Sequence, residues 1–383
     1  MKIPFNKPYM TGKELEYISK AHASGQLSGN GPFTKKCQLW LEEHIGCKMA
    51  LLTHSCTAAL EMAAILADIR PGDEVIMPSY TFVSTANAFV LRGGVPVFVD
   101  IRPDTLNLDE TKIEEAITPR TKIIVPVHYA GVGCEMDTIM AIAQKYNLLV
   151  IEDAAQGILS TYKGRPLGSI GHMAALSFHE TKNIISGEGG ALLINDQRFI
   201  ERSEIVWEKG TNRSQFFRGQ VDKYSWVDIG SSYLPSEINA AFLYAQLEHS
   251  EKIIAKRCRI VKEYQTLLKP LEHEGLIQLP VVGSSCSWNG HIVYIITRSL
   301  EERTQLIQYL EENQIYAIFH YVPLHSSPAG IKYGRKSGKL SVTDDISSRL
   351  IRLPMFFELT DKDLERVVEV ITDFFQKKKT TIG

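Results

Sequence analysis

The stretch KIIVPVHYAGVGCEMDTIMAIAQKYNLLVIED, residues 122–153, decides the fold. It begins and ends with the apolar runs 122–127 and 148–152, and a helical pattern over 136–146 lies between them. Runs that are apolar at nearly every position indicate strands buried on both faces of a parallel sheet. A helix between two such strands is the crossover of a βαβ unit. We therefore expect an α/β fold in this region.

The same alternation of strands and helices extends over residues 50–200. Further strands are expected at residues 74–77, 95–100, 174–178 and 190–194, and a further helix at 56–67. After residue 271 the sequence predicts a strand at 291–297, a helix at 300–313, a strand at 316–319 and a helix at 361–377. One long helix over 235–270 is expected to connect the two parts. We predict a large domain over residues 1–240, with a mixed and mostly parallel sheet, and a linking helix with a small α/β domain over 241–383.

Composition argues against several classes of protein. The 383 residues are 44% hydrophobic and 22% charged, which is ordinary for a globular protein, and the net charge of −2 gives no reason to expect nucleic acid. The six cysteines lack the spacing of a metal site or a disulfide framework, as is usual in a reducing cytosol. No apolar run reaches the roughly 18 residues of a membrane span, and the N-terminus lacks the apolar core of a signal peptide. We expect a cytoplasmic protein with no metal, nucleic-acid or membrane partner.

A lysine stands between a predicted strand and a glycine-rich stretch, where SFHETK at residues 177–182 is followed by GEGG at 187–190. Ligands of open α/β sheets bind at the carboxyl ends of the strands, which is where Lys182 is expected. A shielded lysine loses its charge more easily, becomes nucleophilic and can form a Schiff base with an aldehyde cofactor. Glycines let the backbone pass close to a bound ring and phosphate. On its own, this pattern is more often a surface lysine in a loop.

A carboxylate at the end of the strand 148–152 favours a cofactor-binding role for Lys182 over a surface position. Asp153 can pair with a protonated pyridine nitrogen, which keeps a cofactor ring cationic so that it can accept electrons from a carbanion. Gln156, three residues later, can donate a hydrogen bond to the phenolic oxygen of the same ring. The alternative for Asp153 is an ordinary aspartate at the end of a strand.

Two further segments fit the phosphate and the flat ring of such a cofactor. THSCTAAL at residues 53–60 places Ser55, Cys56 and Thr57 at the start of an alanine-rich helix, where N–H groups and the helix dipole favour a phosphate. Ser177 can add a hydroxyl to the same phosphate. Phe82, in a loop after a predicted strand, can stack on the ring. The alternatives are plain helix capping for the first segment and a core position for the aromatic residue.

Six of these candidates occur in a characteristic order: Thr57, Phe82, Asp153, Gln156, Ser177 and Lys182. This set resembles the DegT/DnrJ/EryC1/StrS family of sugar aminotransferases. VHYAG at 127–131, HYVPLH at 320–325 and LP at 353–354 also match, and the resemblance runs from about residue 3 to about residue 375. It implies a fold-type I enzyme with pyridoxal 5′-phosphate as cofactor, Lys182 as the Schiff-base lysine and Asp153 as the partner of the ring nitrogen. It also implies a homodimer with shared active sites and amino-group transfer from L-glutamate to a nucleotide-linked keto-sugar.

Residues 79–94, 209–224 and 227–241 resemble, within this family, the members that make dTDP-4-amino-4,6-dideoxygalactose for enterobacterial common antigen. The resemblance implies amination of C4 of dTDP-4-keto-6-deoxyglucose. A gluco epimer or C3 amination of a related sugar are the alternatives. Many members carry a GYNYR-type segment whose Asn reaches the cofactor phosphate of the partner subunit. This chain has GSSYL at 230–234, so Ser232 is the residue expected to replace that contact.

Four more residues are candidates for binding the sugar nucleotide. By resemblance, the loop 209–223 faces the site of the partner subunit, and its Arg213 and Arg218 can hold a diphosphate. His320 and Tyr321 are candidates for orienting the sugar. The alternatives are a solvated surface loop and ordinary residues of a domain interface.

Two rival functions remain at this stage. A sugar dehydratase of the same family carries histidine in place of the lysine, so Lys182 argues against that activity. A regulatory protein with an aminotransferase-like domain usually has an added DNA-binding domain, for which 383 residues leave no room.

Overall fold

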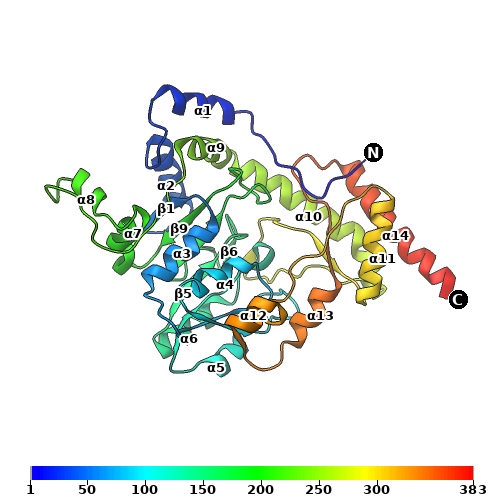
Figure 1. Ribbon diagram of the computed structural model, residues 1–383. Coiled ribbons are helices and arrows are strands. Elements are labelled where there is room, and N and C mark those ends of the chain that lie inside the picture. Colours follow the sequence, from blue (N-terminus) through cyan, green and yellow to red (C-terminus); the bar gives the residue numbers. More distant parts are fainter. Residues whose placement is uncertain (1, 383) are drawn as a thin grey trace.

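An eight-stranded sheet forms the centre of the protein in the computed structural model, which describes the backbone of residues 2–382 and the side chains of residues 2–379 (Figure 1). The strand order is β1-β9-β8-β5-β4-β2-β3-β12. The strands are β1 (Met49–Thr53), β2 (Glu74–Pro78), β3 (Val95–Val99), β4 (Thr121–Ile124), β5 (Leu149–Asp153), β8 (Met173–Ser177), β9 (Gly190–Ile194) and β12 (Arg335–Lys336). Within this sheet β9 alone runs antiparallel to its neighbours. The carboxyl ends of the other seven strands therefore lie at one edge, and the predicted α/β fold with a mostly parallel sheet is confirmed.

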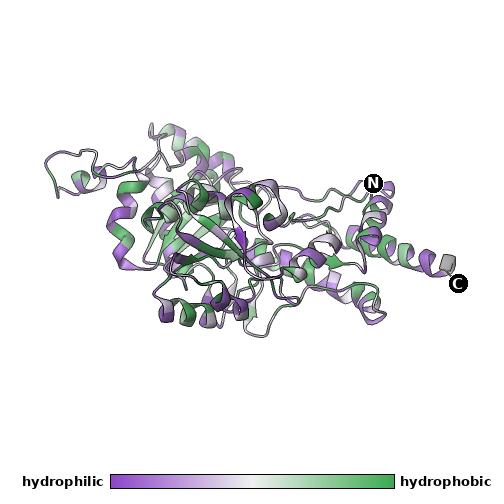
Figure 2. Cartoon of the chain, turned by 60° about the horizontal axis from the view of Figure 1, so that its bottom comes forward, coloured by the Kyte–Doolittle hydropathy of each residue, from purple (hydrophilic) through white to green (hydrophobic). Residues whose placement is uncertain are grey.

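Helices cover both faces of this sheet because its strands are apolar on both sides. Along β8, Met173 and Ala175 pack in one core cluster with the helix α3 (Cys56–Leu66), whereas Ala174 and Leu176 pack in another with α2 (Pro32–Ile45). Side chains that alternate along a strand point to opposite faces, so the two clusters lie on opposite sides of the sheet. The remaining helices of this part are α1 (Glu14–Ala23), α4 (Val83–Val90), α5 (Ile113–Ala116), α6 (Met136–Tyr146), α7 (Ile200–Trp207), α8 (Arg213–Phe217) and α9 (Glu237–Leu247). Figure 2 shows the hydrophobic residues concentrated on the sheet and on the inner sides of these helices.

The C-terminal part of the chain has a hydrophobic core of its own, built from residues between Ile260 and Phe375 together with Ile3. Its elements are α10 (Ser250–His273), β11 (Tyr294–Ile296), α11 (Leu300–Glu312), β13 (Leu350–Arg352) and α14 (Asp361–Ile382). The short β10 (Cys286–Ser287) lies between α10 and β11 on the sequence, and α12 (Pro328–Tyr333) and α13 (Ser341–Arg349) lie between α11 and β13. The N-terminal segment reaches this core, since Ile3 pairs with Ile315 (Figure 1). A domain division at residue 240 stays a prediction.

Two sequence-based predictions in this part are wrong. The single helix expected over 235–270 is two helices, α9 and α10, because α9 packs against α1 and α2 whereas α10 packs against α14. The strand expected over 316–319 is reduced to one bridge, between Ile318 and Arg352, on the edge of β13 that does not pair with β11. Within the described part of the chain, no helix combines the length and the apolar character that a membrane crossing requires.

Candidate active site

The predicted site residues come from segments that follow parallel strands. Asp153 is the last residue of β5, and Lys182 lies five positions after the end of β8. Cys56 begins α3, three residues after β1, and Phe82 precedes α4, four residues after β2. Because these strands run in one direction, all four residues lie at the carboxyl edge of the sheet, where open α/β sheets bind ligands.

Lys182 is half-buried, and its Nζ has no hydrogen bond or ion pair with any described residue. Burial lowers the pKa of the lysine, and the positive charge of Arg352 lowers it further. The charge of Asp153 acts in the opposite direction without reversing the shift. A lysine with a lowered pKa holds more of its amine in the neutral, nucleophilic form.

The loop that carries Lys182 is fixed by hydrogen bonds on both sides of the lysine. The Lys182 backbone N–H donates to the His179 carbonyl over 2.9 Å. The next residue, Asn183, is buried; its amide donates to the Asn289 carbonyl over 2.9 Å, and its Oδ1 shares a hydrogen bond of 2.8 Å with His291 Nδ1. The lysine therefore projects from an anchored turn that is held by the C-terminal part of the chain.

The glycine-rich stretch brings β9 against the start of α3. A Cβ atom on Gly190 would lie 2.4 Å from the Cys56 backbone nitrogen, and one on Gly189 would lie 2.3 Å from Ser186 Oγ. No side chain fits at either contact. The glycines thus allow the lysine loop, the first residue of β9 and the start of α3 to meet at the same edge.

Asp153 is buried and accepts hydrogen bonds from neutral donors. Its Oδ2 accepts from Thr85 Oγ1 over 2.7 Å, and its Oδ1 accepts from the Ala155 backbone N–H over 3.2 Å. Thr85 is held in turn by a hydrogen bond of 2.8 Å to Thr81. Among the described residues no cationic side chain pairs with Asp153. A buried carboxylate without a cationic partner fits a ligand that brings a positive charge, such as a protonated pyridine nitrogen.

The start of α3 offers the features of a phosphate site. Ser55 caps the helix, its Oγ accepting from the Ala58 N–H over 3.1 Å, and Thr57 Oγ1 shares a hydrogen bond of 2.7 Å with Ser84 Oγ. The N–H groups of Cys56 and Thr57 lie in the first turn, where a helix leaves its donors without intrahelical partners. Ser177 is buried at the end of β8 and accepts only a long hydrogen bond of 3.4 Å from the His179 N–H.

Aromatic and amide side chains line the other side of the site. Phe82 is 57% exposed, and its ring centroid lies 6.4 Å from that of Tyr321. The Tyr321 hydroxyl accepts a hydrogen bond of 2.8 Å from Gln156 Nε2, and the Gln156 Oε1 accepts one of 2.7 Å from the Ala130 N–H. One N–H of the Gln156 amide is therefore used within the chain. An exposed phenylalanine beside the buried polar groups leaves a ring face open for stacking.

His320 lies on Tyr321, with the ring centroids 3.7 Å apart, and its Nδ1 shares a hydrogen bond of 2.7 Å with the Tyr129 hydroxyl. Burial lowers the pKa of His320 well below its usual range, and the charges of Arg352 and Lys182 add to the effect. At neutral pH His320 is therefore an uncharged ring within the site.

Three predicted residues lie apart from this group. Arg213 and Arg218 belong to an arm, residues 209–229, that projects from the body of the molecule with α8 at its end (Figure 1). Arg218 forms a two-pronged ion pair with Glu204 over 2.7 and 2.8 Å, and Arg213 lies 5.1 Å from the ring of Phe217. Ser232, just after the arm, is exposed, and its backbone pairs with Glu208.

The arm also exposes a group of large apolar side chains. The exposed fractions are 69% for Phe217, 52% for Tyr224, 81% for Trp226 and 51% for Val227. Several large exposed apolar side chains on one short segment are typical of an interaction site in a soluble protein.

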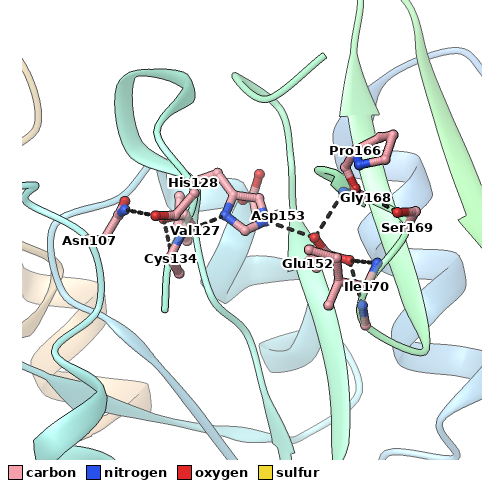
Figure 3. A network of polar contacts seen from close by, with 12 residues as sticks. Asn107, Val127, His128, Cys134, Glu152, Asp153, Pro166, Gly168, Ser169 and Ile170 are labelled. Atoms are coloured by element: carbon pink, nitrogen blue, oxygen red, sulfur yellow. Dashed lines mark hydrogen bonds and ion pairs between the residues drawn. The ribbon is translucent and has the colours of Figure 1, made fainter. Parts of the chain in front are cut away.

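A buried hydrogen-bond network that was not predicted from the sequence lies beneath Asp153 (Figure 3). Both oxygens of Glu152 are used: Oε2 accepts from His128 Nε2 over 2.8 Å and from the Gly168 N–H over 2.9 Å, and Oε1 accepts from the N–H groups of Ile170 and Gly171 over 2.7 and 2.6 Å. His128 Nδ1 accepts a hydrogen bond from the Cys134 N–H, so the ring proton is on Nε2. The signal in the sequence was a glutamate inside the apolar run 148–152.

Burial by itself would raise the pKa of Glu152. The hydrogen bond from His128, together with those from the N–H groups of Gly171 and Gly168, outweighs burial and lowers the pKa. Glu152 therefore remains a carboxylate within the core of the protein.

Arg352, at the end of β13, was also missed. It is half-buried, and no described acidic side chain pairs with it. The signal was an arginine within LIRLPMF, residues 350–356, a run that is otherwise apolar.

Comparison with known proteins gives a consistent result. The model of the DegT/DnrJ/EryC1/StrS aminotransferase family matches residues 8–372. The spore coat polysaccharide biosynthesis protein SpsC of Bacillus subtilis (strain 168) is 33% identical, over 97% of this chain and 96% of its own length. The uncharacterized protein MJ1066 of Methanocaldococcus jannaschii is 36% identical, over 96% of each chain. The putative sugar aminotransferase Spr1654 of Streptococcus pneumoniae is similar at 26% identity with a TM-score of 0.90, both in a PMP-form (99% of this chain and 100% of that chain) and in a PLP-form (98% and 99%).

The Glu152 network leads to a prediction about stability. Glu152→Gln should lower the free energy of unfolding by about 3 kcal/mol at neutral pH, because an amide cannot accept all four hydrogen bonds. The folded pKa of Glu152 lies below its ordinary value of 4.5, so its contribution is complete above that value and is lost as the pH falls through the folded pKa. Urea unfolding at neutral pH and at about pH 4 should show the difference from the wild type shrink with acid. The control is Glu115→Gln, which changes an exposed glutamate; an equal and pH-independent effect of both variants would contradict the prediction.

Proposed function

The chain belongs to the DegT/DnrJ/EryC1/StrS aminotransferase family, and from this premise we propose that it transfers an amino group from L-glutamate to C4 of dTDP-4-keto-6-deoxy-D-glucose. The products are dTDP-4-amino-4,6-dideoxy-D-galactose and 2-oxoglutarate. Family and relatives establish the coarser statement, a sugar aminotransferase of sugar or polysaccharide biosynthesis with pyridoxal phosphate as cofactor. The observation that carries the proposal is the presence of two groups at the same edge of the sheet. One is the amine of Lys182, whose pKa is lowered, and the other is the buried carboxylate of Asp153, which has no cationic partner among the described residues.

The residues at the carboxyl edge fit the cofactor part by part. Lys182 would hold its aldehyde carbon, and Asp153 its ring nitrogen. The first turn of α3, with Thr57 and the nearby Ser177, would hold the phosphate, and Phe82 would cover the ring. The bound cofactor supplies a cationic ring that accepts the electron pair released at the carbon bearing the amino group.

The side chains then have separate tasks in the reaction. Lys182 Nζ takes the proton from Cα of glutamate and, in the second half of the cycle, delivers a proton to C4 of the sugar. Asp153 keeps the proton on the ring nitrogen through its negative charge. Gln156 and the uncharged His320 and Tyr321 present neutral hydrogen-bonding groups to the ring oxygen and to the sugar hydroxyls. Release of 2-oxoglutarate before the sugar binds gives ping-pong kinetics.

The diphosphate of the sugar nucleotide calls for cationic side chains that can bind it. Arg213 and Arg218 are on the arm, so we propose a homodimer in which the arm of each copy reaches the site of the other. Ser232 would then approach the cofactor phosphate across the interface. Arg218 would exchange Glu204 for a phosphate, which accepts the same two-pronged hydrogen bonds. The exposed apolar side chains of the arm supply the surface that such a contact would bury.

The same proposal places the protein in the cytoplasm and in the synthesis of enterobacterial common antigen. Its support is the resemblance of residues 79–94, 209–224 and 227–241 to family members that make the galacto product. A dehydratase is the weaker candidate, because that activity requires an amine-free residue at the position of Lys182.

Lys182→Ala should reduce turnover by at least about 100-fold, since the variant lacks both the attachment point and the base. Turnover is measured as the release of 2-oxoglutarate in the presence of L-glutamate and the keto-sugar nucleotide. Borohydride reduction of the wild-type protein should fix the cofactor covalently to the peptide that contains Lys182. Lys122→Ala, at an exposed position on β4, is the control and should keep full activity. Full turnover by Lys182→Ala would exclude the assigned role.

The apolar side chains of the arm should be required for the proposed homodimer. Light scattering should give a dimer of the 43.0 kDa chain, and Trp226→Asp should shift it towards the monomer and reduce activity in parallel, because a charge replaces the most exposed aromatic of the arm. Val281→Asp, at an exposed apolar position outside the arm, serves as the control. A monomer with full activity would refute the proposed dimer.

Identification of the product tests the proposed function itself. After incubation with dTDP-4-keto-6-deoxyglucose and L-glutamate, proton NMR should show a small H3–H4 coupling, which means an axial nitrogen and the galacto product. A large coupling means an equatorial nitrogen and would replace the galacto product by its gluco epimer. Nitrogen at C3 would move the reaction to a different ketone, and the absence of any aminated sugar would refute the function.

A further inference from the structure

Arg352 faces the active site although it belongs to the C-terminal part of the chain. On β13, Ile351 packs in the C-terminal core, whereas Leu350 packs in a cluster with Tyr80 and Tyr129, which follow β2 and β4 of the large sheet. Side chains two positions apart on a strand lie on the same face. Arg352 therefore lies on the face of β13 that is directed towards those tyrosines and the carboxyl edge of the sheet.

The guanidinium of Arg352 is only partly used by the protein. Its Nε and Nη2 donate to the same acceptor, the Phe319 carbonyl, over 3.3 and 3.2 Å. A guanidinium has five N–H groups, so three remain without an acceptor among the described residues. The guanidinium carbon lies 4.8 Å from the centroid of the Phe5 ring, which covers one face of the group. The unused N–H groups form an edge that is free to bind an anion.

Neighbouring arginines show how unusual this state is. Arg349, three residues earlier, forms an ion pair with Asp345 and donates to the Thr297 carbonyl over 2.6 Å. Arg303, whose guanidinium carbon lies 6.0 Å from the centroid of the Phe319 ring, also lacks an acidic partner among the described residues, but it is not among the charges that shift the pKa of Lys182. Arg352 differs from Arg349 because it lacks a described carboxylate partner, and from Arg303 because its charge lowers the pKa of the Lys182 amine.

The positive charge of Arg352 lowers the pKa values of Lys182 and His320 in the site. Burial lowers the pKa of Arg352 itself. The guanidinium nevertheless remains charged at neutral pH, since an arginine is a very weak acid. An unpaired, half-buried cation is costly in the free protein. A ligand that brings a negative charge next to the reacting carbon would remove that cost.

We propose that Arg352 binds the α-carboxylate of the amino donor, L-glutamate. The proposal rests on the proposed function and names the anchor of its first substrate. The planar fork of a guanidinium matches a carboxylate with two parallel hydrogen bonds. In glutamate that carboxylate is one bond away from the carbon whose proton Lys182 removes, so an anchor for it has to lie close to Lys182. In the sugar nucleotide the phosphates are attached across the ring from C4, which places them away from Arg352 and leaves neutral hydroxyls as its neighbours in the second half of the cycle.

Measuring the two half-reactions separately distinguishes binding of the glutamate carboxylate by Arg352 from binding of a sugar phosphate and from a purely structural role. The cofactor-loaded protein is mixed with L-glutamate, and the protein loaded with the aminated cofactor is mixed with the keto-sugar nucleotide; both are followed by cofactor absorbance. For Arg352→Gln the glutamate concentration at half-maximal rate should rise by about 10- to 100-fold, which is the loss expected for a charged hydrogen-bond pair. The sugar half-reaction should change by less than about threefold, on the scale of a neutral contact. Arg352→Lys should recover part of the loss, and Arg303→Gln is the matched control and should behave as the wild type.

A binding measurement gives a second readout that does not depend on turnover. Calorimetric titration with glutarate, a dicarboxylate without a reactive amine, should show weaker binding to Arg352→Gln than to the wild type or to Arg303→Gln. Equal losses in both half-reactions together with a lower melting temperature would overturn the proposal, because they would make Arg352 a structural tie to Phe319. A loss confined to the sugar half-reaction would overturn it in favour of a phosphate anchor.

These results are distinguishable from a failure of the proposed function. If glutamate changes the absorbance of the wild-type protein and Arg352→Gln responds at the same concentrations, only the assignment of Arg352 is wrong. If the wild-type protein responds to no glutamate concentration and forms no aminated sugar, the proposed function is wrong, and the assignment of Arg352 falls with it.

Discussion

The buried carboxylate of Glu152 is the constraint on which the active-site edge depends. It lies one residue before Asp153 on β5, so the two side chains point to opposite faces of the sheet. Three of its four donors are backbone N–H groups of the loop before β8, and the fourth is His128 from the segment after β4. A buried carboxylate is tolerated only when it is hydrogen-bonded. Both segments are therefore held against β5, and this fixes the direction in which Asp153 points on the other face.

With the scaffold fixed in this way, the site itself can hold charges that the chain leaves unpaired. Asp153 accepts only neutral hydrogen bonds, and Lys182 and Arg352 make no described ion pair. Unpaired charges near a protein core destabilise the folded state, so their accumulation at one edge indicates a site that is completed by ligands. Each has a counterpart in the proposed reaction: a ring nitrogen for Asp153, an aldehyde carbon for Lys182 and a carboxylate for Arg352. The network of Glu152 stabilises the surroundings of these groups without neutralising any of them.

The sequence predicted the strands β2, β3, β4, β5, β8 and β9 because each is an apolar run between turn residues. It could not predict that β9 runs antiparallel, since the run 190–194 is apolar in either direction and the direction is set by the loop that carries Lys182. It misjudged 235–270 because a helical pattern continues across Glu248 while the packing partners change there. In the site, residue order and type pointed to Lys182 and Asp153, but Glu152 and Arg352 were missed. A single charged residue in an apolar run has several possible roles, and only the fold shows which loops supply its partners.

The division of the site between the sheet edge and the arm has a consequence for specificity. In the proposed reaction, the groups assigned to proton transfer and most of those assigned to the cofactor lie within one chain, at the ends of parallel strands and at the start of α3. Arg213, Arg218 and Ser232 lie on or beside an arm that projects from that chain, with an apolar surface on the same segment. In the proposed dimer, the sheet edge performs the amino-group transfer, while the arm of the second copy selects the nucleotide sugar. Changes in the arm would then alter which sugar is aminated and leave the glutamate half-reaction intact, because the anchor assigned to glutamate, Arg352, lies on β13 of the same chain as Lys182.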